Sequence, residues 1–154
     1  MTPIQLAEKE WEANTTPHPK MHRISEFRME FRKHEFRQYG EAIALLNWPQ
    51  DCLEIAKLER LPGVGRGATT PLVIFLKSLA DKYHIRLSCL VKPYKPDLPW
   101  PDDERIPTQE ELETWYKKRG FQLLTQEKPA PTWAWYPDIP RIYTDGGSGC
   151  LPAD

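Results

Sequence analysis

The sequence predicts a single α/β (α+β) domain in which a mixed central sheet is flanked by helices. Two apolar segments, 41–48 and 52–61, meet at a proline-containing turn and predict a strand hairpin. A glycine-rich stretch, 63–70, leads into a segment with helical spacing of its apolar residues, and strand and helix patterns alternate from there to residue 143. The 154 residues are enough for one domain with a real core, so the predicted domain spans 1–154.

The charge balance and the cysteines exclude several classes of protein. Lys and Arg number 21 against 22 Asp and Glu, a net charge of −1 that argues against binding to nucleic acid or anionic membranes. No apolar run approaches the roughly 20 residues of a membrane span, and the charged N-terminus does not read as a secretory signal. Cys52, Cys89 and Cys150 lack CxxC spacing, which argues against a disulfide framework or a zinc ribbon and favours a reducing, cytoplasmic location.

The two ends of the chain give the weakest signals of structure. Residues 3–13 predict a short helix, because three apolar residues fall on one side. Residues 22–39 fit the period of two of a strand better than a helix, although two phenylalanines also suit helical spacing. The region 1–40 is therefore poorly assigned, and 144–154 is expected to form a flexible tail.

The segment after the glycine-rich stretch predicts a helix followed by a strand. Pro71 lies in the first helical turn, where a missing N–H costs little. Residues 85–91 place apolar side chains at alternate positions and predict a strand. The helix itself is indicated by apolar residues at i, i+3, i+4, i+7 and i+11, which are Leu72, Phe75, Leu76, Leu79 and Tyr83.

The C-terminal third alternates loop, helix and strand signals. Five prolines within 92–107 predict a long irregular loop, of a length that is often functional. Thr108–Glu111 has the spacing of a capping box, so a helix begins there, and Gly120 ends it. Residues 121–126 predict a strand, and the proline-interrupted segment 132–143 predicts an edge strand.

The glycine-rich stretch is the first candidate for a binding site. Backbone N–H groups at a turn between a strand and a helix, together with the positive end of the helix dipole, suit a phosphate group. Arg66 would add a charge-assisted contact to an outer phosphate. The stretch lacks the Gly-Lys-Ser/Thr ending of a Walker A loop and the spacing of a Rossmann fingerprint. A sharp turn without a ligand is the alternative, and a nucleotide-binding domain is a weaker third interpretation.

A longer pattern supports a specific family. The segment VGRGATTPLVIFLKSLADKYHIRLSCLV, followed by LETWYKKRGFQLL, resembles the GNAT acyltransferase (N-acetyltransferase) superfamily over residues 52–126. In that family a strand meets an R/Q-x-x-G-x-G/A loop, then a helix, a strand and a second helix ending in Y-x-x-x-G-F. Arg60-x-x-Gly63-x-Gly65 fits the letters of the loop motif. Val64-x-x-Gly67-x-Thr69 better fits the distance to the helix motif, and we prefer it.

The resemblance implies a GNAT-like fold and an acyl donor. Acetyl-CoA would lie in a V-shaped opening between strands 52–61 and 85–91. The backbone of four residues at the end of the first strand would pair with the pantetheine arm: Leu58, Glu59, Arg60 and Leu61. The N–H groups of the following loop would hold the pyrophosphate, from residues Gly65, Arg66, Gly67, Ala68 and Thr69. No metal is implied, and His18 and His22 are poor evidence for one.

Direct transfer of an acyl group to an amine requires an acid and a base. Tyr116 matches the family position that often protonates the leaving thiolate. Glu54 is the first candidate for the base and Glu59 the second. Because they are five residues apart, the strand period places them on opposite faces. His34 is a distant third candidate.

The acceptor and the partners are the least determined part of the function. An acidic run over 102–113 would suit a cationic amine such as a polyamine, an aminoglycoside or lysine, although ordinary solvated charge explains it as well. The aromatic residues Trp100, Trp133, Trp135 and Tyr136 would form a contact surface or core anchors. We therefore expect an N-acetyltransferase acting on a small-molecule or protein amine. The alternative is a catalytically inactive GNAT-like module that binds a protein partner, and a homodimer stays open.

Overall fold

The computed structural model describes residues 1–18, 36–49, 52–65, 67–93, 106–126 and 131–137. These residues form three helices and seven strands. In chain order they are α1 (Pro3–Asn14), β1 (Thr16–Pro17), β2 (Phe36–Tyr39), β3 (Ala42–Asn47), β4 (Cys52–Arg60), α2 (Thr70–Tyr83), β5 (Arg86–Leu90), α3 (Gln109–Lys118), β6 (Gln122–Thr125) and β7 (Thr132–Trp135). Within the region 1–40 that the sequence left poorly assigned, residues 19–35 lie outside the described residues, and so does the tail 144–154.

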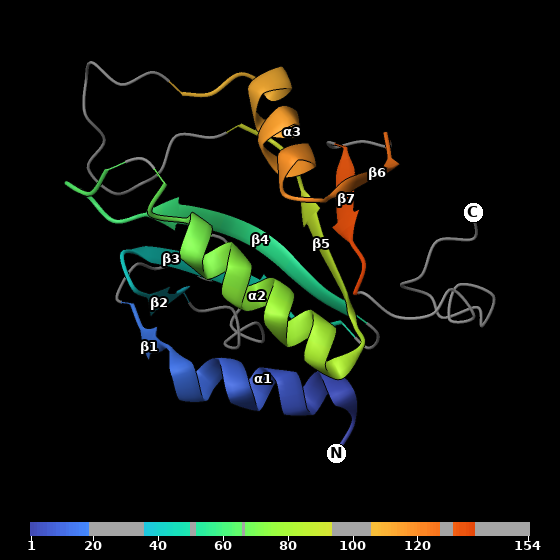
Figure 1. Cartoon of the computed structure of the whole chain (residues 1–154). Coiled ribbons are helices and arrows are strands. Elements are labelled where there is room, and N and C mark those ends of the chain that lie inside the picture. The colour runs from blue at the N-terminus through green and yellow to red at the C-terminus, as the bar shows by residue number, and fades with distance from the viewer. Residues whose placement is uncertain (19–35, 50–51, 66, 94–105, 127–130, 138–154) are drawn as a thin grey trace, which may run out of the picture.

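The strands form one mixed sheet in the order β1-β2-β3-β4-β5-β7-β6. Neighbouring strands are antiparallel except for β4 and β5, which are parallel and are connected by α2. Figure 1 shows the sheet running behind α2, with α1 below this helix and α3 above it. This arrangement confirms the predicted mixed α/β sheet flanked by helices.

The segment predicted as an edge strand is an inner strand. β7 lies between β5 and β6, with Cys89 opposite Trp133 on one side and Leu123 opposite Trp133 on the other. The prediction was wrong because Pro131 and Pro137 both fall just outside the strand, so neither removes an N–H group from its ladders. The edge strands of the described sheet are β1 and β6.

One face of the sheet carries all three helices, and we call it the helix face. Residues of α1, α2 and α3 share a single core cluster with alternate residues of the central strands. The buried strand residues of this cluster are Ala42, Ala44, Leu46, Leu53, Ile55, Leu87, Cys89 and Trp133. On the opposite face, which we call the far face, Phe36, Ile43 and Leu45 form a second cluster.

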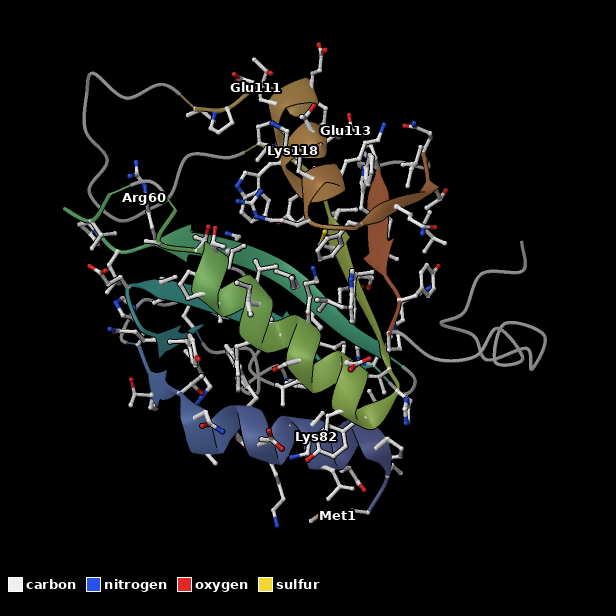
Figure 2. All side chains as sticks on the ribbon, in the orientation of Figure 1. Met1, Arg60, Lys82, Glu111, Glu113 and Lys118 are labelled. Carbon is white, nitrogen blue, oxygen red and sulfur yellow. The ribbon has the colours of Figure 1, made fainter. Side chains whose placement is uncertain are left out.

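The helix ends follow local sequence signals. α1 and α3 each begin with a capping box, in which Thr2 and Thr108 accept a hydrogen bond from the backbone three residues later. α3 ends where predicted, with Gly120 at φ +90°. Lys82 of α2 lies beside α1 (Figure 2), and both Lys82 and Tyr83 donate hydrogen bonds to Glu10 of α1. No helix within the described residues is long and apolar enough to cross a membrane.

Candidate active site

The two parallel strands separate part of the way along their length. β4 pairs with β5 from Cys52 opposite Arg86 to Ile55 opposite Cys89, and the ladder ends there. β4 continues to Arg60 and stays paired with β3 as far as Ala42. In Figure 1 the carboxyl ends of β4 and β5 accordingly point in different directions, with the start of α2 beside the end of β4. The predicted V-shaped opening between these strands therefore begins beyond Ile55 and Cys89.

A bulge in β4 lies at the point of separation. The β3–β4 register shifts between Leu45 and Leu46: Leu45 lies opposite Lys57, while Leu46 lies opposite Ile55. Ala56 is the extra residue, and it packs against the far-face cluster. Lys57 also falls on the far face because its partner Leu45 does. Two successive residues of β4 therefore share one face.

The bulge overturns the predicted orientation of the two glutamates. Glu54 lies opposite Asn47, one residue after the helix-face residue Leu46, and so is on the far face. Glu59 lies opposite Ile43, which belongs to the far-face cluster. The prediction of opposite faces was wrong because counting by two fails across a bulge. Both carboxyl groups are on the far face.

The two glutamates differ in their surroundings. The Asn47 side chain donates a hydrogen bond to Glu54 Oε1 over 2.9 Å, and Glu54 is half-buried. Glu59 is buried, at 3% exposure. Glu54 lies where β4 and β5 are still paired, opposite Ser88, whereas Glu59 lies beyond the point where they separate. The third candidate base, His34, lies outside the described residues.

The loop between β4 and α2 is shaped by its glycines and by Arg60. Gly67 has φ +89°, a conformation that favours glycine, and its carbonyl accepts a hydrogen bond from Thr70 N–H. Arg60 Nη1 donates to the Val64 carbonyl over 3.0 Å, and Figure 2 shows Arg60 beside the end of β4. Thr69 is the N-cap of α2, but its side chain makes no capping hydrogen bond. The preferred alignment of the loop motif, Val64-x-x-Gly67-x-Thr69, thus places Gly67 and Thr69 directly at the start of α2.

The other predicted donor-binding residues are spread over both faces. Leu58 packs against the helix-face core, and Leu61 packs against the far-face cluster. The Leu61 N–H already donates to the Glu41 carbonyl on the β3 side, so this group is not directed to the opening. Gly65 is exposed and Ala68 half-buried, both in the loop before α2. Arg66 lies outside the described residues.

Tyr116 lies at the point where β4 and β5 separate. Its ring is buried and packs edge-on against Trp115 and Phe121, with centroids 4.9 Å and 5.2 Å away. Its hydroxyl lies near the Cys89 thiol, at the last β5 position paired with β4. Burial, followed by the nearby Cys89 sulfur, raises the pKa of Tyr116 well above its ordinary value. Burial likewise raises the pKa of the Cys89 thiol, which the sequence did not single out.

The structure gives several of the acidic and aromatic residues local roles. Glu111 completes the capping box of α3, and Glu113 accepts a hydrogen bond from Trp133 Nε1 over 3.1 Å. Trp133 is buried in the core, while Trp135 is half-buried beside Lys77. Trp100 and residues 102–105 lie outside the described part of the chain. Among the residues that are described, no three His, Cys, Asp or Glu side chains cluster as metal ligands would.

No family model and no curated protein matches the chain. Two solved structures are similar to it. The crystal structure of the anti-CRISPR protein AcrVA5 aligns with a TM-score of 0.48 at 15% identity, over 64% of this chain and 93% of that chain. The crystal structure of the Bacillus subtilis N-acetyltransferase YlbP in complex with coenzyme A aligns with a TM-score of 0.41 at 24% identity, over 70% of this chain and 69% of that chain.

Proposed function

We propose that this chain is an acetyl-CoA-dependent N-acetyltransferase that transfers the acetyl group directly to a primary amine of a small molecule or a protein. One observation carries the proposal: the hydroxyl of Tyr116 reaches Cys89 where the parallel strands β4 and β5 separate. A buried proton donor at the mouth of an opening between two strands is the arrangement that the sequence resemblance implied. The resemblance itself supplies the reaction class.

The start of α2 suits the diphosphate of the donor. Positive φ at Gly67 turns the backbone just before the helix, and a Cβ at this position would meet no atom within 4 Å. There is thus room for a ligand close to the backbone. The N-terminal turn of α2, which the Thr69 side chain does not cap, carries the positive end of the helix dipole. These features fit a diphosphate held by the loop 63–69.

The acyl arm would follow β4 beyond the bulge. An extended ligand that adds to a strand edge is held by main-chain hydrogen bonds. The part of β4 from Leu58 to Arg60 lies beyond its last pair with β5, so this segment faces the opening. It leads from the Cys89 level, where Tyr116 lies, to the glycine loop at the start of α2. The acetyl end of the donor would therefore lie near Tyr116, and its diphosphate would lie at the glycine loop.

Tyr116 and Glu54 divide the proton transfers of the proposed reaction. Acetyl-CoA supplies the thioester, whose sulfur must be protonated as it leaves. Tyr116 is protonated at neutral pH, as its ordinary pKa of 10.0 already requires, and burial raises that pKa further, so a proton is available for the leaving sulfur. Glu54 accepts the proton of the amine, directly or through a water. It lies on the far face whereas Tyr116 lies on the helix face, so the two groups would act on the reacting carbon from opposite sides of the sheet.

Titration of acetyl-CoA into the full chain by calorimetry tests the proposal. We expect binding in the micromolar range and its loss in Gly67→Trp, which would fill the space at the start of α2. Gly40→Trp is the matched control, because Gly40 also has positive φ, +60°, and open space around it, but lies in the β2–β3 turn. Binding justifies a screen of amines for acetylation. A folded wild-type chain that does not bind would overturn the proposal, and binding without turnover of any amine would favour the inactive module.

A further inference from the structure

We propose that Arg119 binds a phosphoryl group at the start of α2, where its side chain would add to the backbone N–H groups of the glycine loop. The inference rests on the proposed function in one respect, since the phosphoryl group is then one of the acetyl-CoA diphosphate. Arg119 was not among the residues singled out from the sequence, where the family pattern Y-x-x-x-G-F leaves its position open.

The end of α3 directs this side chain to the start of α2. Arg119 is the C-cap of α3, and Gly120 turns the chain away after it. The side chain folds back along the helix, where Nη1 donates to the Trp115 carbonyl over 3.0 Å and the guanidinium stacks on the Trp115 ring at 3.6 Å. Nη2 reaches the hydroxyl of Thr70, the first residue of α2, over 3.2 Å. The guanidinium thus lies within hydrogen-bond reach of the helix start that holds the diphosphate in our proposal.

Not all hydrogen-bond donors of the Arg119 guanidinium have a partner within the described residues. Arg119 Nε is buried and has no hydrogen-bond partner. The partners of Nη1 and Nη2, a carbonyl and a hydroxyl, are both neutral. An arginine has five N–H donors, and a buried donor without a partner is costly. Nη1 and Nη2 each carry a further N–H group that can donate to an acceptor, and a charged acceptor would balance the cation.

A second cation adds to the uncompensated charge. Lys77 Nζ donates to the Arg119 carbonyl over 2.7 Å and lies 5.4 Å from the centre of the Trp135 ring. Burial and the charge of Arg119 lower the pKa of Lys77, and burial lowers that of Arg119. Within the part of the chain that the structure describes, neither cation forms an ion pair with a carboxylate. Such partly buried charges are normally paired in proteins.

A phosphoryl group is the anion that fits this arrangement best. The planar guanidinium presents parallel donors that match two phosphate oxygens, and the same anion would meet the helix dipole of α2. The glycine loop on the other side offers backbone N–H groups, which a diphosphate can use with its second phosphoryl group. Hydrogen bonds to charged partners of this kind change affinity by about ten- to a hundredfold.

Arg119→Gln tests the inference, with Lys118→Gln and Thr70→Val as controls. Lys118 is an exposed neighbour on α3 and gives the same change in charge (Figure 2). Thr70→Val removes the hydroxyl that Arg119 contacts but keeps the guanidinium and the backbone, so it measures the link between α2 and α3 alone. Calorimetry at constant ionic strength gives the affinities of the four chains for acetyl-CoA and for inorganic pyrophosphate.

We expect Arg119→Gln to weaken both ligands by about ten- to a hundredfold, whereas Lys118→Gln keeps the wild-type affinity and Thr70→Val, which keeps the guanidinium, loses clearly less than Arg119→Gln. Unchanged affinity in Arg119→Gln, or an equal loss in Lys118→Gln or Thr70→Val, would overturn the inference. Should Arg119→Gln not fold, Arg119→Lys replaces it, since lysine keeps the charge but not the paired donors; wild-type affinity in that variant would equally overturn the inference.

The failures of the two proposals give different results. If the wild type binds pyrophosphate through Arg119 but does not bind acetyl-CoA, the phosphoryl site stands and the proposed function fails. If acetyl-CoA binds with the same affinity to the wild type and to Arg119→Gln, the function stands and the inference fails. A wild type that binds neither ligand overturns both.

Discussion

Replacing Tyr116 by phenylalanine removes one buried hydroxyl and leaves the ring in place, so it separates proton donation from packing. The ring contacts with Trp115 and Phe121, at 4.9 Å and 5.2 Å, do not need the hydroxyl. The hydroxyl itself lies near Cys89, and sulfur is a weak hydrogen-bond partner. We therefore expect a loss of about 0.5–1 kcal/mol in the free energy of unfolding, at the lower end of the range for a hydrogen bond. For a chain of this size that is roughly 1–4 °C in Tm.

The effect on catalysis should be far larger. A general acid contributes about 10²- to 10⁴-fold to the rate, so kcat for an amine found in the screen should fall by at least about a hundredfold. The affinity for acetyl-CoA should not change, because Tyr116 is not among the residues proposed to hold its phosphates. Cys89→Ser is the control, since it keeps a small group able to contact the hydroxyl and should keep most of kcat. The assay is the initial rate of release of free coenzyme A thiol, together with calorimetry of acetyl-CoA.

The pH dependence gives a second readout of the same residue. The pKa of Tyr116 is raised above its ordinary value of 10.0 in the folded chain, so the folded state keeps a proton that the unfolded state loses. The resulting stability is fully present below pH 10 and is lost as pH rises through the folded pKa. Tyr116→Phe should therefore lose less stability above pH 10 than the wild type. An unchanged kcat in this variant would refute the role as acid, and a loss well above 1 kcal/mol would refute the account of its packing.

Three further substitutions test the account of the fold. Gly67→Ala should cost about 1–2 kcal/mol in urea denaturation because of its positive φ, whereas Gly65→Ala, without positive φ, should cost little; equal effects would contradict the proposed backbone role. Glu10→Gln should make Tm fall less steeply as the pH is lowered. Hydrogen bonds lower the pKa of the Glu10 carboxyl below 4.5, so the stability that this group gives is lost as pH falls through the lowered pKa. Parallel curves of Tm against pH for the variant and the wild type would argue against this account. Trp133→Phe should cost about 1 kcal/mol or more by circular dichroism, since it removes the hydrogen bond to Glu113, and no loss would show that bond to be unimportant.

Several elements could be predicted from the sequence because their signals are local. The capping box at Thr108 and the stop at Gly120 mark both ends of α3, since each depends on hydrogen bonds to backbone groups a few residues away. The apolar repeat after Pro71 predicted α2 for a similar reason, because one turn of helix brings residues three and four apart to the same side. The hairpin of β3 and β4 could also be predicted, because its two strands are adjacent in the sequence and are joined by a short turn.

The candidate site could be predicted only where a motif names a position. Tyr116 and the loop residues Gly67 and Thr69 came from such a motif, and the structure places them at the end of the β4–β5 ladder and at the start of α2. Cys89 and Arg119 carried no signal, because an alternating strand residue and a charged helix end are common in any sheet protein.

The sequence by itself determined the type and order of the elements from β3 to β7, the ends of α3 and the position of the glycine loop before α2. The tertiary structure alone decided that β7 lies inside the sheet, that a bulge brings Glu54 and Glu59 to one face, and that Arg119 reaches the start of α2. The physical reason is the range of the interactions. Caps and periodic faces are set by residues within a turn or two, whereas strand order, bulges and contacts between helices depend on how segments tens of residues apart pack against each other.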